Sequence, residues 1–152
     1  MRRNRVFAVH CPTSNCNLGS GIAPIRRFME AGIPVALGSD VSAGSGFSIF
    51  RAIHYTLQMA KMKWVHSNHR DKFLSLSEAF YLATKSGGSF FGKVGTFEPG
   101  YAFDALAVDD TNLNFDNYTL QHRLERYIYL GDDRHLTHRF CQGKEITAPR
   151  II

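Results

Sequence analysis

Two side chains that can bind a metal or carry a proton stand just after short apolar segments. His10 follows the apolar run 6–9, and Asp40 comes three residues after the apolar run 33–37. Imidazole and carboxylate groups both ligate metals and both act as general acids or bases. If the two segments are strands of one parallel sheet, their carboxyl ends share one rim. We therefore expect His10 and Asp40 to open on that rim.

The residues between these segments predict a helix. Ile22, Ile25, Phe28 and Met29 fall on one helical face, and Gly32 stands where a helix commonly ends. Residues 33–37 are nearly all apolar, which favours a parallel strand buried on both faces. Residues 6–40 therefore predict a strand, a polar turn, a helix and a second strand, joined by a right-handed crossover.

The rest of the chain predicts further helices and strands. Ser75 and Glu78 form a capping box that begins a helix, which extends to Gly87-Gly88 or as far as Phe91. The other predictions are a helix over 47–64, an exposed connector over 65–72, a strand over 103–107, a helix over 120–130, and a strand over 139–146 with a turn at Gly143.

Two other groups of polar residues could take part in chemistry. His66 and His69 are three apart, which would place two ligands on one helical face, but no third ligand accompanies them, so surface histidines are favoured. Asp132, Asp133 and Arg134 are interpreted as a salt-bridged turn near a subunit interface rather than as catalytic residues.

Composition excludes several classes of protein. No apolar run is long enough to span a bilayer and no secretory signal is present, so we expect a cytoplasmic protein without a membrane partner. The three cysteines, Cys11, Cys16 and Cys141, are an odd number at irregular spacing and predict reduced thiols. The net charge of +5 comes from basic residues that are mostly interleaved with acidic ones, which argues against a nucleic-acid partner.

Four motifs in order resemble one family. They are His-Cys-Pro-Thr-Ser-Asn at 10–15 with Gly-Ser-Asp at 38–40, the passage from Gly95 to Asp109, Tyr-Leu-Gly-Asp-Asp-Arg at 129–134, and the segment 138–146. Together they resemble the guanine deaminase family of the zinc-dependent amidohydrolases, over nearly the whole chain from residue 6 to about 146. The resemblance implies an α/β fold: the C-terminal part of a (β/α)8 barrel, followed by strands of a small β-sandwich.

The resemblance also implies domain bounds. Residues 1–99 would form the last two βα units of the barrel with the following helix, and residues 100–152 would contribute to the small β-sandwich. A complete barrel takes about 250 residues. We therefore expect a C-terminal fragment that is inactive alone.

By the same resemblance, the enzyme would hydrolyse guanine to xanthine and ammonia with a water activated by Zn²⁺. Asp40 would ligate the zinc and carry the proton, while His10 and Asn15 would border the pocket of the small-molecule purine. An alternative for His10 is a strand-end histidine bonded to a neighbouring backbone carbonyl. The full-length enzyme would be a homodimer.

The sequence departs from the family in its metal ligands. No His-x-His occurs anywhere, although the family takes its first two ligands from that motif, and a catalytic zinc usually has three protein ligands. The isolated chain is thus expected not to retain zinc. Two alternatives stay open: an amidohydrolase acting on another amino-heterocycle of triazine, cytosine or nucleoside type, and a non-catalytic interaction module.

Overall fold

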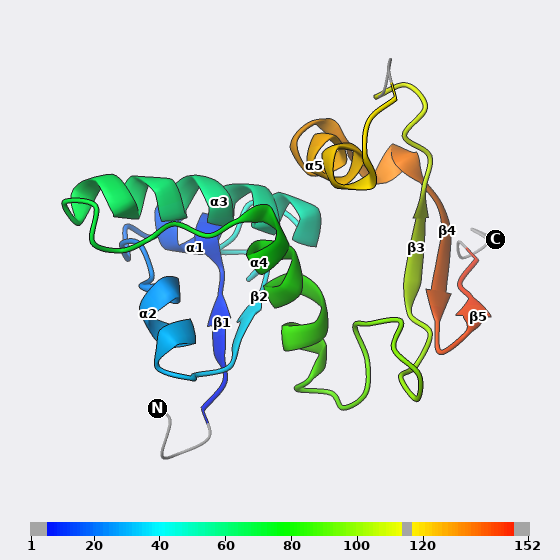
Figure 1. Cartoon of the computed structure of the whole chain (residues 1–152), viewed down its shortest axis with the longest axis horizontal. Helices are drawn as coiled ribbons and strands as arrows, with labels where there is room; N and C mark the ends of the chain where they lie inside the picture. Colours follow the sequence, from blue (N-terminus) through cyan, green and yellow to red (C-terminus); the bar gives the residue numbers. More distant parts are fainter. Residues whose placement is uncertain (1–5, 114–116, 148–152) are drawn as a thin grey trace.

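The computed structural model describes residues 6–113 and 117–147 and contains both helices and strands (Figure 1). Helices α1 to α4 gather around strands β1 and β2, and strands β3 to β5 stand at the other side of the molecule. The elements are β1 (Ala8–His10), α1 (Pro12–Asn17), α2 (Ile25–Glu30), β2 (Val35–Leu37), α3 (Ile49–His66), α4 (Leu76–Tyr81), the π-helix η2 (Leu82–Ser86), β3 (Ala105–Val108), α5 (Leu120–Leu130), the 3-10 turn η3 (Asp133–His135), β4 (Leu136–Cys141) and β5 (Lys144–Glu145).

The predicted parallel strand pair is confirmed. β1 pairs in parallel with β2, with Ala8 opposite Val35 and His10 opposite Leu37. Helix α2 connects them in the chain, and Gly32 ends it in the left-handed region at φ +66°, with its N–H donating to the carbonyl of Met29 at 2.9 Å.

Helix α1 was not predicted, because residues 11–17 were interpreted as a polar turn. Pro12 occupies the first helical turn, where its ring presets φ and its lack of an N–H costs no hydrogen bond. The residue that breaks the strand therefore also begins a helix, which starts directly at the carboxyl end of β1.

The core lies between the β1–β2 pair and the helices. Its buried apolar residues come from α2, β2, α3, α4, η2 and α5 and from the loop before α4: Ile25, Val35, Leu37, Ala52, Ile53, Leu57, Leu74, Ala79, Leu82 and Ile128. Helix α3 contributes three of them at helical spacing, as its predicted periodicity required. It begins two residues later than predicted, with Ser48 as its N-cap, and Phe47 lies outside it with 81% of its surface exposed.

The exposed connector predicted over 65–72 is wrong in part. Helix α3 continues to His66, and Asp71 is only 7% exposed, bound to Arg27 at 2.7 Å. His69 has left the helix with φ +62° and stacks on the Trp64 ring, so it does not share a helical face with His66. Both histidines are exposed, as the surface interpretation predicted.

The predicted capping box begins α4. Ser75 Oγ accepts from the N–H of Glu78 at 3.2 Å, and Glu78 Oε2 accepts from the N–H of Ser75 at 2.8 Å. The same carboxylate is bound by both terminal nitrogens of Arg26 at 2.8 Å each, which ties α2 to α4.

The C-terminal part forms a separate antiparallel sheet in the order β3–β4–β5. The strand predicted over 103–107 is present as β3, two residues later than predicted at its start. The segment predicted as a second strand over 139–146 forms two strands, β4 and β5, joined by a turn at Gln142 and Gly143, which have φ +51° and +77°. Helix α5 spans Leu120–Leu130, as predicted. Asp132 binds Arg134 at 2.6 Å, so the salt-bridged turn is confirmed, whereas its place near a subunit interface stays a prediction.

Two properties of the described residues bear on the predicted class of protein. All three cysteines are free thiols. No helix in 6–113 or 117–147 has the length and apolar character needed to cross a bilayer.

Candidate active site at the carboxyl ends of β1 and β2

The parallel pairing of β1 and β2 places the carboxyl ends of both strands at one edge. His10 faces Leu37 in the register, so the segments that leave this edge are α1, after β1, and the loop 38–48, after β2. Asp40 lies in that loop and is exposed. The edge therefore presents one carboxylate beside a short helix.

Ser14 of α1 holds the Asp40 side chain. Its hydroxyl donates to Asp40 Oδ2 at 2.5 Å, a short bond of the kind expected when a carboxylate accepts from a hydroxyl. Ser14 itself is 4% exposed. No described residue forms a hydrogen bond with the other carboxylate oxygen, so that oxygen can bind a ligand.

The backbone of Asp40 is held in a tight turn. Asp40 has φ +47° and Ser42 has φ +97°, in the region that non-glycine residues rarely adopt. The amides of Ala43 and Gly44 both donate to the carbonyl of Asp40, at 3.1 and 2.5 Å. Gly44 is required here, because a Cβ at this position would lie 1.9 Å from the carbonyl oxygen of Ser39.

Two other side chains of α1 form hydrogen bonds with this turn. Asn17 Nδ2 donates to the carbonyl of Ala43 at 2.8 Å, and Thr13 Oγ1 accepts from the N–H of Ser45 at 3.4 Å. Together with Ser14, these side chains attach three points of the loop to one helix. Strain of this kind commonly persists where surrounding structure enforces it, and it gathers at functional sites.

Cys11 and Asn15 lie on the segment that faces Asp40. Burial and the negative charge of Asp40 both raise the pKa of the Cys11 thiol. Asn15 is half-buried on α1, next to Ser14, and its carbonyl accepts from the N–H of Ser20 at 2.9 Å. The structure thus brings Asn15 and Asp40 to the same edge.

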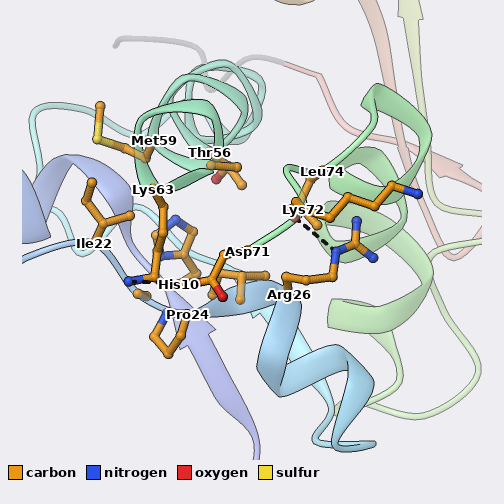
Figure 2. A pocket seen from close by; sticks show the side chains of 13 residues that line it. His10, Ile22, Pro24, Arg26, Thr56, Met59, Lys63, Asp71, Lys72 and Leu74 are labelled. Carbon is orange, nitrogen blue, oxygen red and sulfur yellow. Dashed lines mark hydrogen bonds and ion pairs between the residues drawn. The ribbon is translucent and has the colours of Figure 1, made fainter. Parts of the chain in front are cut away.

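His10 occupies a different environment, shown in Figure 2. Its side chain is 4% exposed and lines a cavity of about 20 Å³, beside residues of α3 and of the segments 22–26 and 71–74. Burial lowers the pKa of His10 to about 4. Asp40 does not line this cavity, and no described residue bonds His10 Nδ1, so that nitrogen does not donate to a backbone carbonyl.

The metal-binding capacity of the described residues is limited. In the ranges 6–113 and 117–147, no cluster of three or more His, Cys, Asp or Glu side chains could hold an ion. Asp40 offers one free oxygen, and a catalytic zinc usually takes three protein ligands. These residues alone do not fit a zinc site.

The sequence pattern points to Asp40 and Asn15 but indicates no role for Thr13, Ser14 or Asn17. The only signal was a set of small polar residues directly after a strand end. Such residues are common in turns, where they bond nearby backbone groups. Only the fold shows that they contact a loop more than twenty residues away.

Comparison with known proteins identifies the family. The model of the Amidohydrolase family matches residues 1–146. The chain belongs to the amidohydrolase family. Among curated proteins, it is similar to the guanine deaminase of Dictyostelium discoideum, with 36% identity over 145 residues that cover 90% of this chain and 32% of that protein.

Solved structures show the same relationship for this amidohydrolase chain. It is 58% identical to a guanine deaminase from C. acetobutylicum solved with guanine in its active site, with a TM-score of 0.93 over 96% of this chain and 35% of the other. An adenosine deaminase from Xanthomonas campestris with bound zinc is 28% identical, with a TM-score of 0.75 over 92% of this chain and 31% of the other. The chain spans about a third of the length of the relatives it matches.

Proposed function

We propose that this chain is the part of a guanine deaminase that carries the catalytic carboxylate, Asp40. The observation that supports this most strongly is the similarity, 58% identity at a TM-score of 0.93, to an enzyme whose structure holds guanine in its active site. The exposed, clamped carboxylate at the edge of the β1–β2 pair agrees with it.

In this proposal, residues 1–99 belong to a (β/α)8 barrel and residues 100–152 to a small β-sandwich. The parallel β1–β2 pair with α2 between its strands is the unit from which such barrels are built. The antiparallel β3–β4–β5 sheet supports a second, distinct layer. Barrel strands on both sides of the pair would then come from the rest of the enzyme.

Deamination of guanine requires proton transfer, which Asp40 can perform. Water adds to the ring carbon that bears the exocyclic amine, and ammonia leaves to give xanthine. Asp40 takes a proton from the water and returns it to the amine, which is a poor leaving group as an anion. Asn15 borders the purine from α1, whereas the buried position of His10 favours a structural contribution over contact with the purine.

Zinc enters the proposal only as a cofactor of the whole enzyme. Because the described residues lack a cluster that could hold the ion, Asp40 would be one ligand and the others would lie outside this chain. The zinc bound to the related adenosine deaminase supports this assignment. The homodimer and the cytoplasmic location stay predictions.

Complementation tests the proposal. The N-terminal two thirds of the C. acetobutylicum enzyme, co-expressed with this chain, should yield a complex that releases ammonia from guanine. In that complex, Asp40→Ala should abolish turnover and Asp40→Asn should lower kcat about 100-fold or more, because proton transfer is lost while the shape is kept. Asp109→Asn, a change at another exposed loop carboxylate, is the matched control and should leave kcat unchanged.

Two outcomes would contradict the proposal. A complex that deaminates adenosine, cytosine or a triazine in preference to guanine would favour another amidohydrolase, for which the likeness to an adenosine deaminase is the supporting observation. A folded complex with no deaminase activity on any of these would favour the non-catalytic module.

A further inference from the structure

Ser14 is buried and its hydroxyl donates to the carboxylate of Asp40, although it has no role in the chemistry proposed so far. We propose that Ser14 is a positioning residue that binds Oδ2 of Asp40 and thereby fixes the orientation of this carboxylate in the active site. This inference rests on the proposed function. Ser14 touches no reacting atom in this scheme, so its effect is exerted through Asp40.

The first support is the bond itself. The Ser14 hydroxyl lies 2.5 Å from Asp40 Oδ2, and Ser14 is 4% exposed, so water competes little for that hydroxyl. Asp40 is exposed, and an exposed carboxylate without a partner would sample several rotamers. One short bond to a buried, fixed donor selects one of them. Proton transfer depends steeply on such placement.

The second support is the rigidity of the donor. Ser14 lies in the first turn of α1, which begins directly after β1, and its backbone is fixed within that helix. The same helix binds Ala43 and Ser45 through Asn17 and Thr13. Backbone and side chain of Asp40 are therefore positioned from a single element, as a preorganised site requires.

Hydrogen exchange on the full chain tests the bond without any activity. The amides of Ala43 and Gly44 bond the Asp40 carbonyl and report on the turn. Ser14→Ala should speed their exchange about 10-fold or more, and the acceleration should be at least threefold smaller in an Asp40→Asn background, where a neutral oxygen accepts a weaker bond. Ser14→Thr, which keeps the hydroxyl, should stay near the original rates.

Ser86→Ala is the matched control. Ser86 is 7% exposed and donates to the carbonyl of Val35 at 2.6 Å, so this change removes a bond of similar length from a similarly buried serine that does not touch Asp40. It should lower thermal stability about as much as Ser14→Ala while leaving exchange at Ala43 and Gly44 unchanged. A purely structural role for Ser14 would make the two variants alike in both measurements.

Kinetics of the complemented deaminase supply the second readout. Ser14→Ala should lower kcat about 10- to 100-fold with KM changed less than about twofold, Ser14→Thr should recover most of kcat, and Ser86→Ala should match the original complex. Unchanged exchange at Ala43 and Gly44, or an unchanged kcat in Ser14→Ala, would overturn the inference. A complex without turnover whose exchange still depends on Ser14 would instead overturn the proposed function, and the inference with it.

Discussion

The ion pair between Arg26 and Glu78 should be the most pH-sensitive contact between α2 and α4. Arg26 is 14% exposed and Glu78 is 34% exposed, and two nitrogens of Arg26 bind both oxygens of Glu78 at 2.8 Å. Arg26 also donates to the carbonyls of Lys72 and Phe73 at 3.1 and 3.2 Å. We consider the change Glu78→Gln, which removes the charge and keeps the shape.

The magnitude follows from the pKa of Glu78. The hydrogen bonds from Arg26, followed by the contribution of Ser75, lower that pKa from 4.5 to about 2. This corresponds to about 3 kcal/mol of preference for the charged carboxylate. Because a third of Glu78 is exposed, solvent screening reduces the expected loss to about 1–2 kcal/mol at pH 7.

The pH dependence has a definite sign. The folded pKa of Glu78 lies below its unfolded value, so the stabilisation is fully present above about pH 4.5 and is lost as the pH falls toward 2. Urea unfolding followed by circular dichroism should show the original chain and Glu78→Gln differing by about 1–2 kcal/mol at pH 7 and by less than about 0.5 kcal/mol at pH 2.5. As a control, Glu98→Gln, which breaks the exposed pair with Lys85, should destabilise the chain much less than Glu78→Gln does. A difference at pH 2.5 as large as that at pH 7 would refute this reasoning.

Three further outcomes are expected. Since the folded pKa of His10 lies near 4, below its unfolded value, the chain should lose up to about 3 kcal/mol as the pH falls from 6.5 to 4, and urea unfolding of His10→Asn should show a flatter slope in that window. Gly44→Ala should cost about 1–3 kcal/mol in unfolding and slow turnover in the complemented enzyme, whereas Gly46→Ala, whose added Cβ meets nothing within 4 Å, should do neither. The isolated chain should hold well under one zinc by elemental analysis and should form no xanthine from guanine, because its described residues lack three clustered ligands.

Much of the backbone could be predicted because local signals and packing agree there. In the apolar run 33–37, residues 35–37 form a strand that is buried along its whole length, and Ser75 with Glu78 formed the capping box that their spacing requires. Where signals compete, prediction failed. Pro12 ends a strand and begins a helix in the same place, and only the helix was overlooked.

The candidate site was less predictable because its contacts are distant in sequence. Asp71 lies in a polar stretch that resembles a surface connector, yet it is buried and binds Arg27, which is 44 residues away. His10 is the last residue of β1, and the segments that follow β1 and β2 lie at the rim. The side chain of His10 instead lines the cavity beside α3. Spacing alone cannot show on which side of a short strand the last residue lies when the residues of the strand give no clear alternation.

The loop of Asp40 illustrates how a site can carry strain that its surroundings offset. Left-handed backbone at Asp40 and Ser42 costs on the order of 1–3 kcal/mol each, and neither residue is glycine. The bonds from α1 to the Asp40 carboxylate, to Ala43 and to Ser45 are each worth roughly 0.5–1.5 kcal/mol, the charged one above the others. Cost and gain are similar in size, so the turn is held only while α1 stays docked. The position of the proposed catalytic carboxylate therefore depends on α1, the helix that follows the neighbouring strand. Any change that displaces α1 should shift Asp40 more than it disturbs the packing of the core.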